Sequence, residues 1–145
     1  MKTKNHVARA EITIYTSAKK VWQALTDPEI IRKYMFGAEV RSEWEEGSKI
    51  IWEGQWQDKQ YKDKGKILEL SPNKRLQYSH FTPLSGEEEV PENYHIVTID
   101  LTEDDNHTVV SLKQDNNHTE VAKEHAEKNW RTILRSLKTI LEQNN

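Results

Sequence analysis

The feature that most limits how this chain can fold is a long stretch in which apolar and polar residues alternate. The alternation runs from about residue 36 to residue 115, in segments separated by Gly, Asp, Asn and Pro. Successive side chains of a β-strand point to opposite faces of a sheet, so this period is typical of strands with one buried face. It predicts six strands, near residues 37–44, 48–56, 61–70, 74–81, 93–103 and 107–115.

A further strand and two short helices are predicted before this stretch. Residues 7–15 also alternate, whereas the apolar residues after Ser17, which include Trp22, recur with the spacing of an amphipathic helix. Ser17 offers an N-cap oxygen to that helix. Asp27 and Pro28 then suit the start of a second helix, with Tyr34 on its inner face.

A long helix is predicted at the end of the chain, over residues 118–143. Asn117 followed by Glu120 resembles a capping box, so we expect Asn117 to cap this helix. At 1.5 Å per residue the helix is about 40 Å long, enough to cross a small domain. Its apolar stripe consists of Val121, Ala122, Ala126, Trp130, Ile133, Leu134, Leu137, Ile140 and Leu141.

This order of elements predicts an α+β fold. An antiparallel sheet of about seven strands would pack one face against the long C-terminal helix, because that arrangement buries both apolar surfaces and leaves the other sheet face polar. No linker or internal repeat interrupts the pattern, and 145 residues suit one domain. We therefore expect residues 1–145 to form a single domain.

The composition of the chain indicates its expected cellular location and which classes of partner are not expected. The chain has no cysteine, which suits a reducing, cytoplasmic environment. Its N-terminus lacks the apolar core of a signal peptide, and no stretch approaches the roughly 18 apolar residues of a membrane span. With a net charge of -3 and no basic stripe, nucleic acid is not an expected partner.

Several catalytic chemistries lack their sequence motifs. The six histidines show no H-E-x-x-H spacing and there are no cysteine ligands, so no metal site is predicted. A G-x-S-x-G nucleophile elbow is absent, and the five glycines are too scattered for a phosphate-binding loop. No catalytic residue and no cofactor are assigned on these grounds.

Large inward-facing side chains are the remaining candidates for function. They fit equally an apolar ligand compartment with a few polar groups and a filled core. His80 and His95 are either core-edge histidines bonded to a neighbour, or polar anchors or acid–base groups beside a cavity. The acidic loop at 82–93 is either a solvated connection or a mobile lid. The inward set is Trp22, Trp44, Trp52, Trp56, Tyr78, His80, His95, Trp130 and Leu134.

Several segments together resemble a known superfamily. They are "TSAKKVWQALTDPEIIRKY", "GSKIIWEGQW", "DKGKILELSPNKRLQYSHF", "VTIDLTEDDNHTVVSLKQDN" and "NWRTILRSLKTIL". Their order resembles the helix-grip (SRPBCC) superfamily of START lipid-transfer domains and the birch pollen allergen, and most closely its branch named after the activator of the heat-shock-protein ATPase. The resemblance covers about residues 8–142 and implies a curved sheet that grips the long helix around a cavity.

The resemblance implies a binding function but leaves alternatives open. In many members the cavity holds a lipid, a polyketide or another largely apolar molecule, so we expect a small hydrophobic or aromatic (for example flavonoid-like) ligand. Tyr34 and Met35 would then flank the cavity mouth. One alternative is a stress-related, co-chaperone-like module with a protein partner, and another is a cyclase- or hydrolase-type enzyme that uses a cavity histidine. Fold alone does not choose between these functions.

Overall fold

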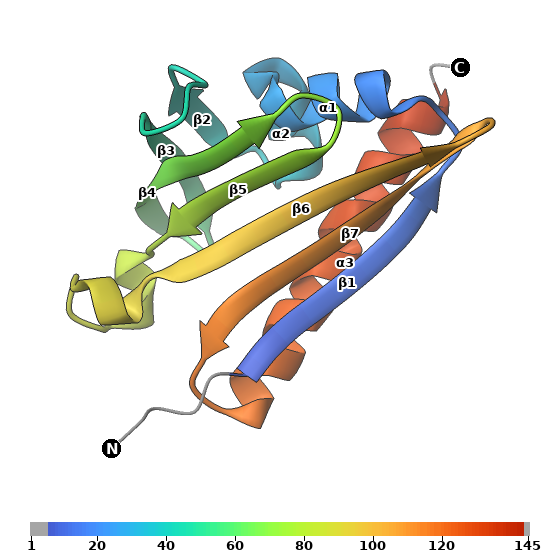
Figure 1. The fold of residues 1–145 in the computed structure, drawn as a ribbon. Helices are drawn as coiled ribbons and strands as arrows, with labels where there is room; N and C mark the ends of the chain where they lie inside the picture. The colour runs from blue at the N-terminus through green and yellow to red at the C-terminus, as the bar shows by residue number, and fades with distance from the viewer. Residues whose placement is uncertain (1–5, 144–145) are drawn as a thin grey trace.

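The computed structural model describes residues 6–143, except for the side chain of Trp56. Over these residues the chain forms an antiparallel sheet of seven strands, with one long helix against one of its faces (Figure 1). The strands lie in the order β1-β7-β6-β5-β4-β3-β2. The predicted helix-grip fold is confirmed. Its elements are β1 (His6–Ile14), α1 (Ala18–Thr26), α2 (Pro28–Tyr34), β2 (Glu39–Ser42), β3 (Lys49–Trp56), β4 (Lys59–Ser71), β5 (Arg75–His80), β6 (His95–Asp104), β7 (His107–Asn117) and α3 (Glu120–Gln143).

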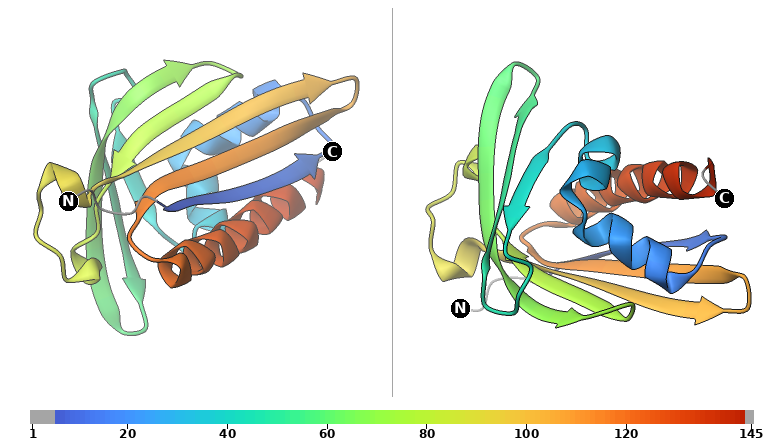
Figure 2. Two further views of the ribbon diagram at one scale, coloured as in Figure 1. Left: turned by 60° about the horizontal axis from the view of Figure 1, so that its bottom comes forward. Right: turned by 90° about the horizontal axis from the view of Figure 1, so that it is seen from above.

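The sheet is strongly curved, and the curvature is concentrated in β4. The first part of β4 pairs with β3 and its last part pairs with β5. The change of partner lies near Gly65, and the register with β5 shifts between Ile67 and Glu69, as at a β-bulge that bends a strand. As a result β2, β3 and the start of β4 turn away from β6 and β7 and face the helix layer from a second side (Figure 2).

The two short helices begin as the sequence predicts. Ser17 Oγ accepts a hydrogen bond from the backbone N–H of Lys20, and Asp27 Oδ1 accepts one from that of Glu29. After α2 the chain turns through left-handed conformations at Phe36 and Gly37, with φ of +56° and +83°. This turn directs the chain into β2, which lies beside α2.

The cap of the long helix differs from the prediction. Asn117 is a buried residue at the end of β7, where its side-chain amide donates to the carbonyl oxygens of His6 and Gln114. Thr119 Oγ1 instead accepts from the backbone N–H of Ala122. The predicted capping box is therefore wrong, because the strand runs two residues further than the alternation indicated and takes Asn117 into its own hydrogen bonding.

The core lies between the sheet and a layer of α1, α2 and the C-terminal half of α3. On α3 the buried residues are Ile133, Leu134 and Leu137, whereas Val121 is 65% exposed. The predicted apolar stripe is thus wrong at the start of the helix. None of the described helices is long and apolar enough to span a membrane.

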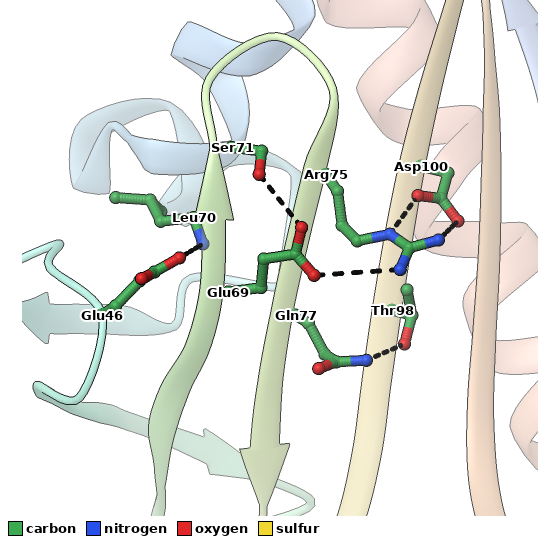
Figure 3. Close-up of polar contacts among 8 residues, drawn as sticks. All are labelled: Glu46, Glu69, Leu70, Ser71, Arg75, Gln77, Thr98 and Asp100. Carbon is green, nitrogen blue, oxygen red and sulfur yellow. Dashed lines mark hydrogen bonds and ion pairs between the residues drawn. The ribbon is translucent and has the colours of Figure 1, made fainter.

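The opposite face of the sheet is polar. Figure 3 shows Arg75 on β5 between Glu69 on β4 and Asp100 on β6. Its guanidinium donates to both carboxylate oxygens of Asp100, at 2.6 and 3.2 Å, and beside it Gln77 donates to Thr98. Such cross-strand pairs stabilise a half-exposed sheet face modestly. The face that holds large apolar side chains is therefore the one turned towards the helices.

Candidate ligand-binding site

The layer between the sheet and α3 has a filled part and an open part. The filled part encloses a void of only about 30 Å³, so it is ordinary close-packed core. The open part is a cavity of about 850 Å³. Ligand pockets of proteins typically measure about 300 to 1,000 Å³. The space between the sheet and α3 is therefore close-packed at one end and open at the other.

The cavity lies beside the N-terminal half of α3, where that helix buries no apolar side chain against the sheet. Its other walls are the turn after α2, the inner faces of β3 to β7 and the start of the loop at 82–94. The lining residues are Met35, Phe36, Ala38, Trp52, Tyr61, Asp63, Tyr78, His80, Thr82, Leu84, His95, Gln114, His125, Ala126, Lys128, Asn129, Trp130, Thr132 and Ile133.

Trp130 lies between the two parts: with Met35, Trp52, Tyr78 and Ile133, it lines both the small void and the large cavity. Its indole N–H donates to Gln114 Oε1 on β7 at 2.8 Å. The amide group of Gln114 in turn donates to Asn117 Oδ1 at 3.2 Å. These hydrogen bonds hold the ring at a fixed position on the cavity wall.

Two aromatic side chains form the sheet side of the cavity. Trp52 and Tyr78 are both buried, and their ring centroids lie 5.1 Å apart. Trp52 also meets the ring of His80 edge-on at 5.0 Å. Burial raises the pKa of the Tyr78 hydroxyl, which keeps it protonated. The sheet wall is therefore aromatic and neutral.

A polar cluster adjoins this aromatic wall. His80 Nε2 lies 2.9 Å from Asp63 Oδ2, and the Asp63 side chain is only 13% exposed. The rings of His80 and His95 lie 6.5 Å apart. Nδ1 of His95 donates to the backbone carbonyl of Asp115 at 2.8 Å, and burial lowers the pKa of His95. Two histidines and a carboxylate thus lie together on the wall of a largely apolar cavity.

The loop that follows β5 is tied to the sheet. Glu89 accepts hydrogen bonds from Lys64 at 2.7 Å and from the Tyr94 hydroxyl at 3.0 Å. The hydrogen bond from Lys64, followed by that from Tyr94, lowers the pKa of Glu89. Thr82 and Leu84 at the start of this loop line the cavity. The loop is therefore part of the cavity border.

The structure brings six of the predicted site residues to the large cavity: Met35, Trp52, Tyr78, His80, His95 and Trp130. Three others line only the small void, namely Tyr34, Trp44 and Leu134. The Tyr34 hydroxyl donates to the Ala24 carbonyl and so joins α2 to α1. Trp22 packs against the core from α1. The side chain of Trp56 lies outside the described part of the chain.

Sequence reasoning missed several lining residues, above all Tyr61, Asp63 and Gln114. On β4 the odd-numbered residues Tyr61, Asp63 and Ile67 point to the same face of the sheet, so the alternation could have identified Tyr61 and Asp63 as inward residues.

After Ile67 the β-bulge shifts the alternation by one residue, and Leu70 rather than Glu69 packs against the core. Because of this shift, the inward positions of β4 do not follow one rule along the whole strand. Within residues 6–143, no group of three or more His, Cys, Asp or Glu side chains is arranged to hold a metal ion.

Solved structures share this fold. ChR145 from Cytophaga hutchinsonii is 49% identical over 99% of this chain and 98% of its own, with a TM-score of 0.86. The Aha1 dimer from Colwellia psychrerythraea is 24% identical over 92% of this chain and 93% of its own, with a TM-score of 0.71. CalU16 from Micromonospora echinospora is 20% identical over 96% and 85%, with a TM-score of 0.70. A comparison with curated proteins gave no match.

The family match covers the whole cavity. The sequence model described as "Activator of Hsp90 ATPase homolog 1-like protein" matches residues 15–142, from the end of β1 to the last turn of α3. The resemblance drawn from the sequence segments is thereby confirmed, and the chain belongs to the family of Activator of Hsp90 ATPase homolog 1-like proteins.

Proposed function

We propose that this protein binds a small, largely hydrophobic or aromatic molecule, such as a lipid, a polyketide or a flavonoid-like compound, in the cavity beside α3. The observation that carries the proposal is the cavity of about 850 Å³ between aromatic walls and a small polar cluster. Transfer of apolar ligand surface from water into such a space contributes about 25 cal/mol per Å², less the cost of association.

Each residue's place on the cavity wall would determine which part of the ligand it contacts. Trp130 forms the helix wall, Trp52 and Tyr78 form the sheet wall, and His80 or His95 supplies the polar contact. Met35 would flank the cavity mouth. Trp52, Tyr78 and Trp130 also line the small void. The other residues around that void therefore pack against the side of these three rings that faces away from the cavity.

The test is a titration of the purified protein with fatty acids, flavonoids and steroids while intrinsic tryptophan fluorescence is followed. We expect saturable quenching by at least one class. The quenching amplitude should fall in Trp130→Phe and persist in Trp22→Phe, a matched change on α1 away from the cavity. If no class changes the emission, and calorimetry detects no heat of binding, the proposal is wrong.

A second candidate function is an enzyme of the cyclase or hydrolase type, and the Asp63–His80 pair favours it. A carboxylate that holds one imidazole nitrogen fixes the ring and leaves the other nitrogen to take up a proton from a bound substrate. Each ligand that binds should then be incubated with the protein and analysed by mass spectrometry. Conversion by the wild type but not by His80→Ala or His95→Ala, with binding retained, would support catalysis; full conversion by both variants excludes it.

A further inference from the structure

The polar cluster of the cavity has a defined hydrogen-bonding character. A backbone carbonyl can only accept, so the contact between His95 Nδ1 and the Asp115 carbonyl oxygen places the ring hydrogen on Nδ1. Burial lowers the pKa of His95, which favours the neutral ring. In a neutral ring with a protonated Nδ1, Nε2 is an acceptor.

His80 has the complementary arrangement. Its Nε2 lies 2.9 Å from the carboxylate of Asp63, an acceptor, so the ring hydrogen sits on Nε2 and the neutral ring keeps Nδ1 as an acceptor. Asp63 thus acts as a positioning residue that sets the tautomer of His80. Its own Oδ1 is the buried side-chain polar atom that lacks a hydrogen-bond partner in the described part of the chain. The other ring nitrogens, Nδ1 of His80 and Nε2 of His95, are not among such buried, unbonded atoms in the described chain, and both side chains line the cavity.

Possible donors near these nitrogens are few. Gln114 donates one amide hydrogen to Asn117 and keeps the other, and its carbonyl oxygen accepts from Trp130. The phenols of Tyr61 and Tyr78 can either donate or accept. Lys128 and His125 lie across the cavity, on exposed positions of α3. The sheet end of the cavity therefore offers more acceptors than donors.

We propose that the His80–His95 corner selects ligands that donate a hydrogen bond, namely molecules with a phenolic or alcoholic hydroxyl on an apolar body. This inference rests on the proposed binding function and names the ligand class for it. The ring centroids lie 6.5 Å apart. A hydroxyl group has one hydrogen, so one hydroxyl can donate to one of the two rings and a second hydroxyl on the same ligand to the other. An ether at the same position has no hydrogen to donate and leaves the ring nitrogens without a partner.

The test uses three matched pairs of ligands: 7-hydroxyflavone and 7-methoxyflavone, estradiol and its 3-methyl ether, and tetradecanol and its methyl ether. Dissociation constants are measured by calorimetry or fluorescence at pH 7.5. For every pair that binds, we expect the hydroxyl compound to bind the wild type about tenfold or more tightly than its ether. The preference should be lost in the double variant His80→Phe/His95→Phe and kept in His107→Phe, the same kind of change at the start of β7, where the side chain does not line the cavity.

A second measurement does not depend on whether a variant folds. Long-range ¹H–¹⁵N spectra of the wild type report the tautomer of each ring. We expect hydrogen on Nδ1 of His95 and on Nε2 of His80 at pH 7.5. The opposite tautomers, or a protonated His95, would overturn the inference.

The outcomes separate the two proposals. If ethers bind as tightly as their hydroxyl partners, the inference about donors is overturned while the binding function stands. If none of the six compounds binds, the binding function fails and the inference fails with it. If the hydroxyl preference survives in the double variant His80→Phe/His95→Phe, the selection lies elsewhere in the cavity and the assigned corner is wrong.

Discussion

Trp130 on α3 donates its indole N–H to Gln114 on β7 at 2.8 Å, and this bond lies where the close-packed core gives way to the open cavity. The buried apolar residues of α3 begin at Ile133, whereas the first half of the helix is joined to β1 by polar contacts such as that of Glu127 with the backbone N–H of Arg9. The Trp130–Gln114 bond therefore links the helix to the sheet at the cavity wall.

The Trp130–Gln114 bond should contribute measurably to stability. Gln114→Leu leaves the half-buried indole N–H without its partner, which we expect to cost about 1 to 3 kcal/mol of the free energy of unfolding. Trp130→Phe removes that donor. In the double variant the cost of Gln114→Leu should therefore shrink, with a coupling energy of about 0.5 to 1.5 kcal/mol in urea unfolding. Additive costs would show that the bond contributes nothing.

The order of the elements was predictable because each signal is local. Alternation gave the strands to within a few residues, and Ser17, Asp27 and Pro28 marked the starts of α1 and α2. The cap of α3 was not predictable in this way. Asn117 and Thr119 both suit an N-cap, and the choice between them depends on the pairing of β7 with β1, which lies more than a hundred residues away in the chain.

The candidate site was predictable only in part. Strand alternation identified Trp52, Tyr78 and the two histidines, and helical spacing identified Trp130. Neither pattern could tell which inward residues face empty space and which contact another side chain. That distinction depends on the bend in β4 and on the point along α3 where packing begins. Trp44 and Leu134 therefore looked the same in the sequence as the residues of the cavity wall, although they line the filled part.

Leu137 should be a main support of the filled part. It is fully buried on α3, so Leu137→Ala removes apolar contacts and leaves a cavity, at an expected cost of about 2 to 5 kcal/mol. Val121 on the same helix is 65% exposed, and Val121→Ala should change the free energy of unfolding by less than about 0.5 kcal/mol. Urea unfolding of both variants checks this, and similar costs would contradict the placement of the core.

Gly65 should be intolerant of a side chain. A Cβ at this position would lie 1.7 Å from the backbone carbonyl oxygen of Ser79, which belongs to the adjacent strand and cannot rotate away. We expect Gly65→Ala to cost about 3 kcal/mol or more. In the matched variant Gly54→Ala, the new Cβ meets the Tyr61 ring, which can move, so the loss should be smaller. Equal losses in urea unfolding would argue against a close approach of β4 and β5.

His95 should make stability depend on pH from about 7 downward, through its lowered pKa in the folded protein. Burial is the main cause of its lowered pKa, and the nearby His80 ring adds to the effect, while the bond to the Asp115 carbonyl opposes it. An unfolded chain has an ordinary histidine pKa of about 6.5, so below that pH it binds more protons than the folded protein does. The free energy of unfolding should then fall as the pH drops from about 7 through the folded-state pKa. His95→Asn removes this contribution and should flatten the slope measured by urea unfolding in that window. Glu89 and Glu142 also have lowered pKa values, but they affect stability only below their ordinary value of about 4.5 and therefore not in this pH range. An unchanged slope in His95→Asn would mean that His95 takes up its proton as readily in the folded protein as in the unfolded chain.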